Sequence, residues 1–369
     1  MHNVHLHYTL SHRADKAHAA AQTPLLRHPL MELLQAVAQH GSISGAARHL
    51  NLSYRHVWGE LKRWEDVLGN ELIVWEKGQS AKLTAFGDKL MWAERQTQAR
   101  LAPQIASLQA DLERTFAMAF DPEAHVLPLY ASHDDALLAL QDAAAMRGLY
   151  LDIRFCGSVD AIRALNEGRC ILAGFHVRQA PSRSSASARH YRPLLKPGLH
   201  KLIGFSLRAQ GLMVAPGNPL GLSDMRSVVK RQARYAQRSL GTGTRVLQDE
   251  LLAESAGDAG ALRVMADGEP SHAACAALVA SGQADAALGI ASAAHALGLD
   301  FLPLVTEAYH LVCLKSALET PAMQALRARL SDPAWAEQLG RVAGCQPNRS
   351  GEVLSLSRTL PWWRFPRQK

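Results

Sequence analysis

Two hydrophobic patterns divide the chain at about residue 120. Before that point, apolar residues such as Leu30, Leu33 and Val37 recur three and four positions apart, which is the spacing of one face of an α-helix. Beyond it, short apolar runs alternate with alanine-rich helical segments, an alternation typical of parallel α/β domains. The sequence therefore predicts a mixed fold, with an α-rich domain at residues 24–120 and an α/β domain at residues 121–356.

The first domain has the element order of a winged helix-turn-helix, which is helix, helix, turn, helix and hairpin. Gly41 is expected to end the first helix, and Ser53 is a favourable N-cap for the third. Leu52 and Trp58 are expected to belong to the small core. The predicted helices after the first lie at residues 42–50, 54–68 and 84–120, and the hairpin strands lie at residues 71–76 and 81–84.

The start of the third predicted helix carries side chains suited to double-stranded DNA. The first residues of a recognition helix contact base edges, where Arg55 can donate two hydrogen bonds to guanine. Lys62 and Arg63, further along this helix, suit the phosphate backbone. The wing residues Lys77, Gln79 and Lys82 would contact the backbone or the minor groove. A basic surface helix without a DNA role is the alternative. The predicted DNA contacts are Ser42, Ser44, Ser53, Tyr54, Arg55, His56, Lys62, Arg63, Lys77 and Lys82.

Three turns of the α/β domain place hydroxyl groups where a strand gives way to a helix. Ser132 and Ser158 each follow an apolar run, and Thr242 lies in a glycine-rich segment before a predicted helix. Free N–H groups at helix N-termini bind anions, and the carboxyl ends of strands in an open sheet converge. We therefore expect one site for a small anion, with plain helix capping as the alternative. The predicted ligand contacts are Ser132, His133, Asp134, Gly157, Ser158, Thr242, Gly243, Thr244, Arg245 and His272.

Formal charge and catalytic chemistry are less clearly marked in this domain. Either Arg245 or Arg238 can add a positive charge to the anion site, and capping or core packing is the alternative role for His272. The sequence has no Ser/His/Asp triad with a nucleophile elbow and no metal-ligand spacing. It therefore predicts neither an enzyme nor a metal site.

The composition is that of a globular protein. Hydrophobic residues make up 48% of the 369 residues and charged residues 20%, which excludes a chain that is disordered or coiled-coil throughout. No apolar run approaches the roughly 18 residues of a membrane helix, and no secretion signal is evident, so we expect a cytoplasmic protein without a membrane partner. The five cysteines include no CxxC pair, which favours reduced thiols over disulfides or a zinc site.

Charge and the chain ends add three expectations. The net charge is +7, but residues 1–120 contribute only +2, so DNA binding depends on where the charges lie. Residues 1–23, rich in histidine, are expected to be a disordered tail, with metal binding as the alternative. A basic solvated loop is expected at residues 178–201, with a second DNA or partner contact as the alternative, and a tail containing Trp362 and Trp363 at residues 357–369.

The segment GSISGAARHLNLSYRHVWGELKRWEDVLGNELI, followed by LTAFGDKLM, resembles the N-terminal domain of molybdate-responsive ModE-type regulators and, less closely, of LysR-type regulators. Ser53 and Tyr54, with Trp58 four residues after Tyr54, are the ModE-like detail. The resemblance implies a homodimer held by the long helix that follows the wing, with a tetramer as the alternative.

Residues 157–177, 210–225, 241–252 and 271–290, together with residues 350–353, carry a second resemblance. They are similar to the substrate-binding domain of oxyanion- and molybdenum-linked proteins, which implies a two-lobed periplasmic-binding-protein-like fold. The same family occurs fused to molybdopterin-biosynthesis enzymes.

These resemblances lead to a ranked set of hypotheses. The first is a transcription regulator that binds double-stranded DNA and senses molybdate, tungstate or a molybdenum-cofactor-related compound, without a covalently bound cofactor. Its regulated genes would serve molybdoenzymes. The alternatives are a regulator that senses formate or another small carboxylate, a molybdopterin-related enzyme, and an architectural DNA-binding protein whose second domain only oligomerises.

Overall fold

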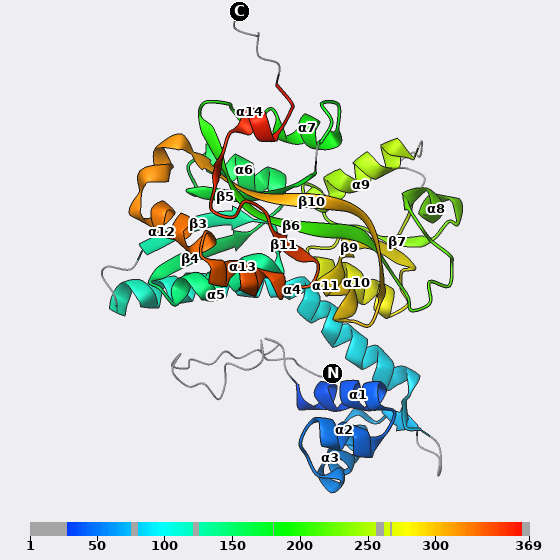
Figure 1. The fold of residues 1–369 in the computed structure, drawn as a ribbon. Helices are drawn as coiled ribbons and strands as arrows, with labels where there is room; N and C mark the ends of the chain where they lie inside the picture. Colours follow the sequence, from blue (N-terminus) through cyan, green and yellow to red (C-terminus); the bar gives the residue numbers. More distant parts are fainter. Residues whose placement is uncertain are drawn as a thin grey trace, which may run out of the picture. The chain divides into compact units, whose positions relative to one another are not determined.

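The computed structural model describes residues 28–74, 80–120, 125–179, 181–255, 262–265 and 268–363 (Figure 1). The chain forms two compact units, one up to Ala102 and one from Pro103 onward. The predicted N-terminal tail at residues 1–23 and the wing tip with Lys77 and Gln79 lie outside the described residues.

The first unit confirms the predicted helix-turn-helix. The side chain of Ser42 accepts a hydrogen bond from the N–H of Gly45, and the side chain of Ser53 accepts one from the N–H of His56, so both helix starts are capped as their sequences suggest. Gly41 takes the left-handed conformation that ends the first helix. The elements are α1 (Pro29–His40), α2 (Ile43–His49), α3 (Tyr54–Leu68), β1 (Ile73–Val74), β2 (Lys82–Leu83) and α4 (Ala85–Phe120), which continues into the second unit.

Glu65 joins α3 to the wing. Its Oε1 accepts hydrogen bonds from the backbone N–H groups of Leu72, at 2.8 Å, and Ile73, at 3.3 Å, and its Oε2 lies 2.6 Å from the Nζ of Lys62. Burial tends to raise the pKa of Glu65, but the bonds from Lys62, Leu72 and Ile73 outweigh it and lower the pKa. A buried carboxylate thus fixes the first wing strand against α3.

The second unit is built on one mixed sheet with strand order β4-β3-β5-β10-β6-β9-β7-β8. Two strands of 15 residues, β6 and β10, pair antiparallel along their length, while β3 pairs parallel with β4 and β5. The elements are β3 (His125–Ala131), α5 (Asp135–Ala145), β4 (Leu149–Phe155), α6 (Ser158–Asn166), β5 (Leu172–Arg178), α7 (Ala186–Tyr191), β6 (His200–Val214), α8 (Met225–Lys230), β7 (Arg234–Ala236), α9 (Gly243–Glu254), β8 (Arg263–Val264), α10 (His272–Ala280), β9 (Ala286–Ile290), α11 (Ala291–His295), β10 (Asp300–Leu314), η3 (Lys315–Glu319), α12 (Pro321–Leu330), α13 (Pro333–Gly340), β11 (Cys345–Pro347), β12 (Val353–Leu354) and α14 (Leu356–Thr359).

The sheet carries two lobes, which confirms the predicted two-lobed α/β domain. In the first lobe, apolar side chains pack on both faces of β3, β4 and β5, under α5, α12 and α13 on one face and under α6 and α7 on the other. In the second lobe, α8 and α9 cover one face of β7 and β9, and α10 and α11 cover the other. The long strands β6 and β10 contribute to both lobes and connect them (Figure 1).

Two segments differ from their sequence-based expectations. The stretch 178–201, predicted as a solvated loop, contains α7, whose Tyr191 is buried. Residues 357–363, predicted as part of a tail, pack on the first lobe, where the side chain of Trp362 is only 2% exposed. Both differences have the same cause, because an aromatic side chain gains more from burial than the flanking polar residues lose.

The C-terminal half of α4 packs along β4, the strand at one end of the sheet. The Oγ of Ser107 accepts a hydrogen bond of 3.1 Å from the N–H of Phe155. The carboxylate of Asp111 lies 3.3 Å from the guanidinium of Arg154. Ala110, which precedes Asp111 in α4, is buried. This part of α4 is therefore fixed to the first lobe.

Replacing Glu65 by alanine is expected to lower the free energy of unfolding of the first unit. The backbone N–H groups of Leu72 and Ile73 lose a charged acceptor, which costs about 2–3 kcal/mol. Urea unfolding followed by circular dichroism measures the change. The control is Glu60→Ala, which removes an ion pair with Arg63 on the surface of the same helix and should cost less than about 1 kcal/mol. Equal effects of the two substitutions would contradict the role given to Glu65.

Buried His310 on β10 is expected to make the protein less stable as the pH is lowered. Burial, with a smaller contribution from the charge of Arg349, lowers the pKa of His310 to about 4. The unfolded chain, with a histidine pKa near 6.5, binds more protons between these values, so stability is lost as pH falls below about 6.5. Between pH 7 and pH 5 this costs about 2 kcal/mol. Urea unfolding at pH 7 and at pH 5 gives the change in the free energy of unfolding between the two pH values. This change should be smaller by that amount in His310→Gln than in the wild type, and equal changes in the two proteins would refute the assignment.

Candidate functional site

The exposed face of α3 presents the side chains predicted to contact DNA. Val57, Leu61 and Glu65 face the core at helical spacing, which turns Tyr54 and Arg55 outward. Among the described residues, neither Arg55 nor His56 has a side-chain hydrogen bond or an ion pair, so both are available to an external partner. Lys82, on the second wing strand, and Ser44, on α2, are also exposed.

Other predicted DNA contacts are engaged within the protein. The hydroxyl groups of Ser42 and Ser53 cap helices, and Lys62 is paired with Glu65. Arg63 forms an ion pair with Glu60. Their predicted contacts with DNA are untested, and for the two serines the geometry gives a structural role.

Trp58 and Leu52 do not belong to the core, contrary to expectation. Trp58 is 44% exposed because it lies one turn after Tyr54, itself 48% exposed, on the outward face of α3. Leu52 is exposed in the turn before α3. The winged domain therefore carries an exposed aromatic pair beside Arg55.

The three hydroxyl-bearing turns meet where the two lobes come together. The Oγ atoms of Ser132 and Ser158 lie 3.0 Å apart. A Cβ added to Gly243 would lie 3.1 Å from the Oγ of Ser158, and the N–H of Val159 donates to the carbonyl of Gly241 at 3.2 Å. The geometry thus brings the predicted turns of both lobes into one mostly buried cluster, in which His133 and Gly157 are partly exposed. We call it the interlobe cluster: Ser132, His133, Asp134, Gly157, Ser158, His176, Arg208, Gln210, Arg238, Thr242, Gly243, Thr244, His272 and Glu307.

A buried ionic network centred on Arg208 forms the base of the interlobe cluster. Burial tends to lower the pKa of Arg208, but the charges of Asp134 and Glu307 outweigh it and raise the pKa. Its Nη2 lies 3.2 Å from the Oε2 of Glu307, and its Nη1 is bonded to Asp134, which also caps α5. The amide of Gln210 donates to Glu307 at 2.7 Å and to the hydroxyl of Thr244 at 3.0 Å, so the network reaches the second lobe.

Of the two arginines predicted as alternatives, Arg238 lies in the interlobe cluster. It is 3% exposed, its Nη1 donates to the carbonyl of Glu269 at 2.8 Å, and its buried Nε has no hydrogen-bond partner. Burial lowers its pKa to about 10, so the group remains charged at neutral pH. The side chain of Arg245 donates to Gln237 at 2.6 Å and lies 3.7 Å from Asp249, so it is engaged within the second lobe, and its contact with a ligand stays a prediction.

Burial disfavours the charged form of the histidines in the interlobe cluster. Burial, followed by the charge of Arg238, lowers the pKa of His272 well below its usual value, and its Nδ1 is buried without a hydrogen-bond partner. Burial also lowers the pKa of His133, whose ring lies against Phe155, and lowers the pKa of His176 to about 3. The site therefore combines one guanidinium that has an unused donor with neutral imidazole rings and hydroxyl groups.

The sequence pattern did not single out Arg208, Gln210, His176 or Glu307. Arg208 and Gln210 lie in the mostly apolar second half of a mostly buried strand, which was a usable signal, because a buried polar residue needs a buried partner. Glu307 could not be paired with Arg208 from sequence, since 99 residues separate them.

Among the residues that the structure describes, no group of three or more His, Cys, Asp or Glu side chains is placed to hold a metal ion. Within the same residues, no helix is both long and apolar enough to cross a membrane.

Two family models match the chain. Residues 140–331, just over half of the chain, match the PBP superfamily domain. Residues 29–88 match the bacterial regulatory helix-turn-helix protein, lysR family. The finer ModE-type resemblance stays a prediction.

Individual relatives are distant. The uncharacterized protein YvgK of Bacillus subtilis (strain 168) is 29% identical over 201 residues, which are 54% of this chain and 64% of that protein, so the match spans less than two thirds of the relative. Full-length BenM is 14% identical with a TM-score of 0.39, over 82% of this chain and 95% of the BenM chain. Full-length LysG from Corynebacterium glutamicum, with its bound effector Arg, is 17% identical with a TM-score of 0.39, over 81% of this chain and 95% of the LysG chain.

The two lobes and the long strands that connect them fit the PBP superfamily match of the second domain. The capped helices of the first domain fit the helix-turn-helix match. The chain belongs to the PBP superfamily, and its N-terminal helix-turn-helix matches the model of the lysR family of bacterial regulatory proteins.

Proposed function

We propose that the protein is a cytoplasmic, DNA-binding transcription regulator whose second domain binds a small anion between its lobes. The observation that carries the ligand is Arg238, a buried guanidinium with an unused N–H donor beside neutral histidines and hydroxyl groups. The pKa of Arg238 is lowered although the charge of Glu269 acts on it, so the buried guanidinium is only partly compensated, and an anion bound by Arg238 would complete the compensation.

The charges around the interlobe cluster explain why Arg238 is favoured over Arg208. Two carboxylates, Asp134 and Glu307, already compensate Arg208. Arg238 donates to the backbone carbonyl of Glu269, and the charge of that residue offsets only part of the effect of burial, which lowers the pKa of Arg238. An anion at this position would also lie near His272, whose Nδ1 is buried and unpaired and can donate in the tautomer that carries the proton there.

The candidate anions are tetrahedral oxyanions and small carboxylates. Molybdate or tungstate is the first choice, on the resemblance of the second domain to oxyanion-linked binding domains. Several hydroxyl donors, such as those of Ser132 and Ser158, suit an anion with acceptors on all sides. Formate or another small carboxylate is the alternative, because a guanidinium binds a planar carboxylate through two parallel bonds.

The partner side of the proposal is double-stranded DNA and a second copy of the chain. Arg55 and His56 would meet base edges, as recognition helices do. An exposed apolar stripe on α4, with one residue per turn, would form the contact between two copies, because such a surface is stabilised by burial. The stripe consists of Leu108, Leu112, Phe116 and Phe120.

The ligand is tested by thermal unfolding of the whole protein with sodium molybdate, tungstate, sulfate and formate. A bound anion should stabilise the fold by about 2.7 kcal/mol at a hundred times its Kd. Arg238→Gln should weaken that binding at least about tenfold, because a hydrogen bond to a charged group is lost. Arg245→Gln is the matched control and should bind as the wild type does. If none of the four anions changes unfolding or DNA binding, the anion proposal fails.

DNA recognition is tested on a duplex selected by the protein from a randomised pool. Arg55→Ala should weaken binding to that duplex by about 1–3 kcal/mol and relax the preference at one base pair. Arg341→Ala, which removes an exposed arginine just after α13, should change the affinity less than about twofold, since it lies outside every predicted contact. Equal losses in both variants would indicate that net charge, rather than α3, governs binding. Gel-shift titration at fixed salt concentration measures both.

A further inference from the structure

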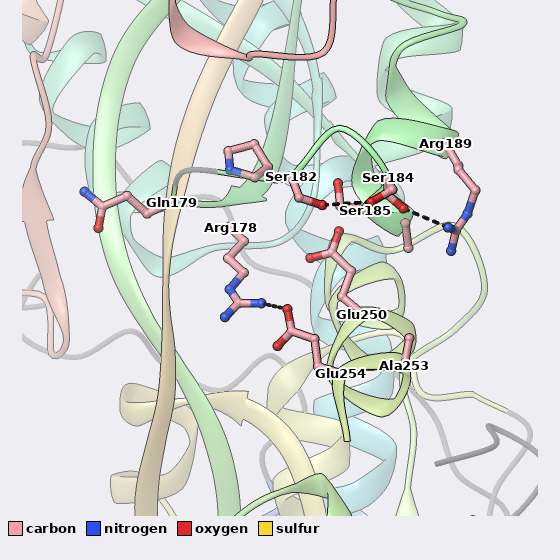
Figure 2. A pocket seen from close by; sticks show the side chains of 11 residues that line it. Arg178, Gln179, Ser182, Ser184, Ser185, Arg189, Glu250, Ala253 and Glu254 are labelled. Atoms are coloured by element: carbon pink, nitrogen blue, oxygen red, sulfur yellow. Dashed lines mark hydrogen bonds and ion pairs between the residues drawn. The ribbon is translucent and has the colours of Figure 1, made fainter. Parts of the chain in front are cut away.

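Helix α9 of the second lobe reaches the first lobe through two carboxylates one helical turn apart. The Oε1 of Glu250 accepts a hydrogen bond of 2.7 Å from the backbone N–H of Ser187 in α7. Glu254 forms an ion pair with Arg178, at the end of β5. Figure 2 shows both glutamates on the same side of α9, with Glu254 paired with Arg178. Because α7 and β5 pack in the first lobe, both contacts cross the boundary between the lobes.

The segment that receives Glu250 is itself fixed to the first lobe. Tyr191, the last residue of α7, is buried, with its ring centroid 6.2 Å from that of Trp362. The side chain of Arg183 donates to the carbonyl of Pro361 at 2.9 Å. The contact of Glu250 with Ser187 therefore links two packed lobes and does not merely order a loop.

The two carboxylates lie in different surroundings. Glu250 is buried, where a hydrogen bond to a charged acceptor is strong. Glu254 is 56% exposed and Arg178 32% exposed, and both line, together with the less exposed Glu250, a cavity of about 420 Å³ at the boundary (Figure 2). Salt in the surrounding solution therefore screens the second contact far more than the first.

We propose that Glu250 and Glu254 form a latch that holds the two lobes together. The latch is made by the protein's own side chains, so it acts whether or not an anion occupies the interlobe cluster. Opening it separates α9 from α7 and also separates the turns of the two lobes, which touch between Val159 and Gly241. The latch thus controls access to the interlobe cluster, and its strength sets how often the cluster meets solvent.

Hydrogen–deuterium exchange of the full-length protein tests the latch at a distance from the mutated residue. The N–H of Val159 is bonded to Gly241 across the boundary, so its exchange reports opening of the lobes. Glu250→Gln should accelerate exchange of the peptide containing Val159 at least about tenfold. Glu254→Gln should accelerate the exchange of this peptide less than Glu250→Gln does. Raising the NaCl concentration should accelerate the exchange in the wild type but not in Glu254→Gln.

The matched control is Asp249→Asn, on the same helix, whose carboxylate faces Arg245 within the second lobe. It should leave the exchange of Val159 unchanged. Faster exchange at Ser187 alone in Glu250→Gln, with Val159 still protected, would overturn the proposal, because the hydrogen bond would then be local. The exposed Glu254→Gln variant keeps the test decisive if Glu250→Gln fails to fold. No anion is added, so the result is independent of whether the proposed ligand is correct.

Discussion

The buried guanidinium of Arg208 sets the constraint on which the second domain depends. A buried charge is tolerated only where counter-charges and hydrogen bonds surround it. Here the counter-charges come from the start of α5 and from β10, and Gln210 extends the network to Thr244 in the other lobe. Satisfying Arg208 therefore fixes the pairing of the two long strands and the placement of both lobes around them. The network need not add net stability to do this, since its value lies in excluding other arrangements.

That constraint also shapes the electrostatics of the neighbouring site. Arg208 is compensated by two carboxylates, whereas Arg238, the other buried guanidinium of the interlobe cluster, is only partly compensated and lies among imidazole rings whose charged form burial disfavours. Hydroxyl groups from both lobes complete the surroundings. Binding of an anion here would involve donors from the two lobes at once, so occupancy and lobe closure would be coupled through shared contacts.

How much the sequence could predict depends on how local each feature is. Gly41 and Ser53 mark helix ends through neighbours a few residues away, so the helix-turn-helix was predictable. The turns at Ser132 and Ser158 were predictable because parallel strands end on one side of a sheet. The pairing of Arg208 with Glu307 and the exposure of Trp58 were not predictable from the sequence. Both depend on which parts of the chain, distant in sequence, pack against each surface. Similarly, nothing near Trp362 indicated that α7 would bury it.

The packing of α4 along β4 has a consequence for the behaviour of the protein in concentrated solution. A strand at the margin of a sheet offers unpaired backbone groups to which other chains can add, and this leads to aggregation. In this protein Ser107 takes up the last N–H of β4, and the charged side chains of Asp111 and Arg154 line the same margin. At the opposite end of the strand order, β8 is only two residues long. Both edges of the sheet are thus protected against edge-to-edge association. Helix α4 covers β4 at one edge, and β8 at the other edge is too short to offer a pairing surface.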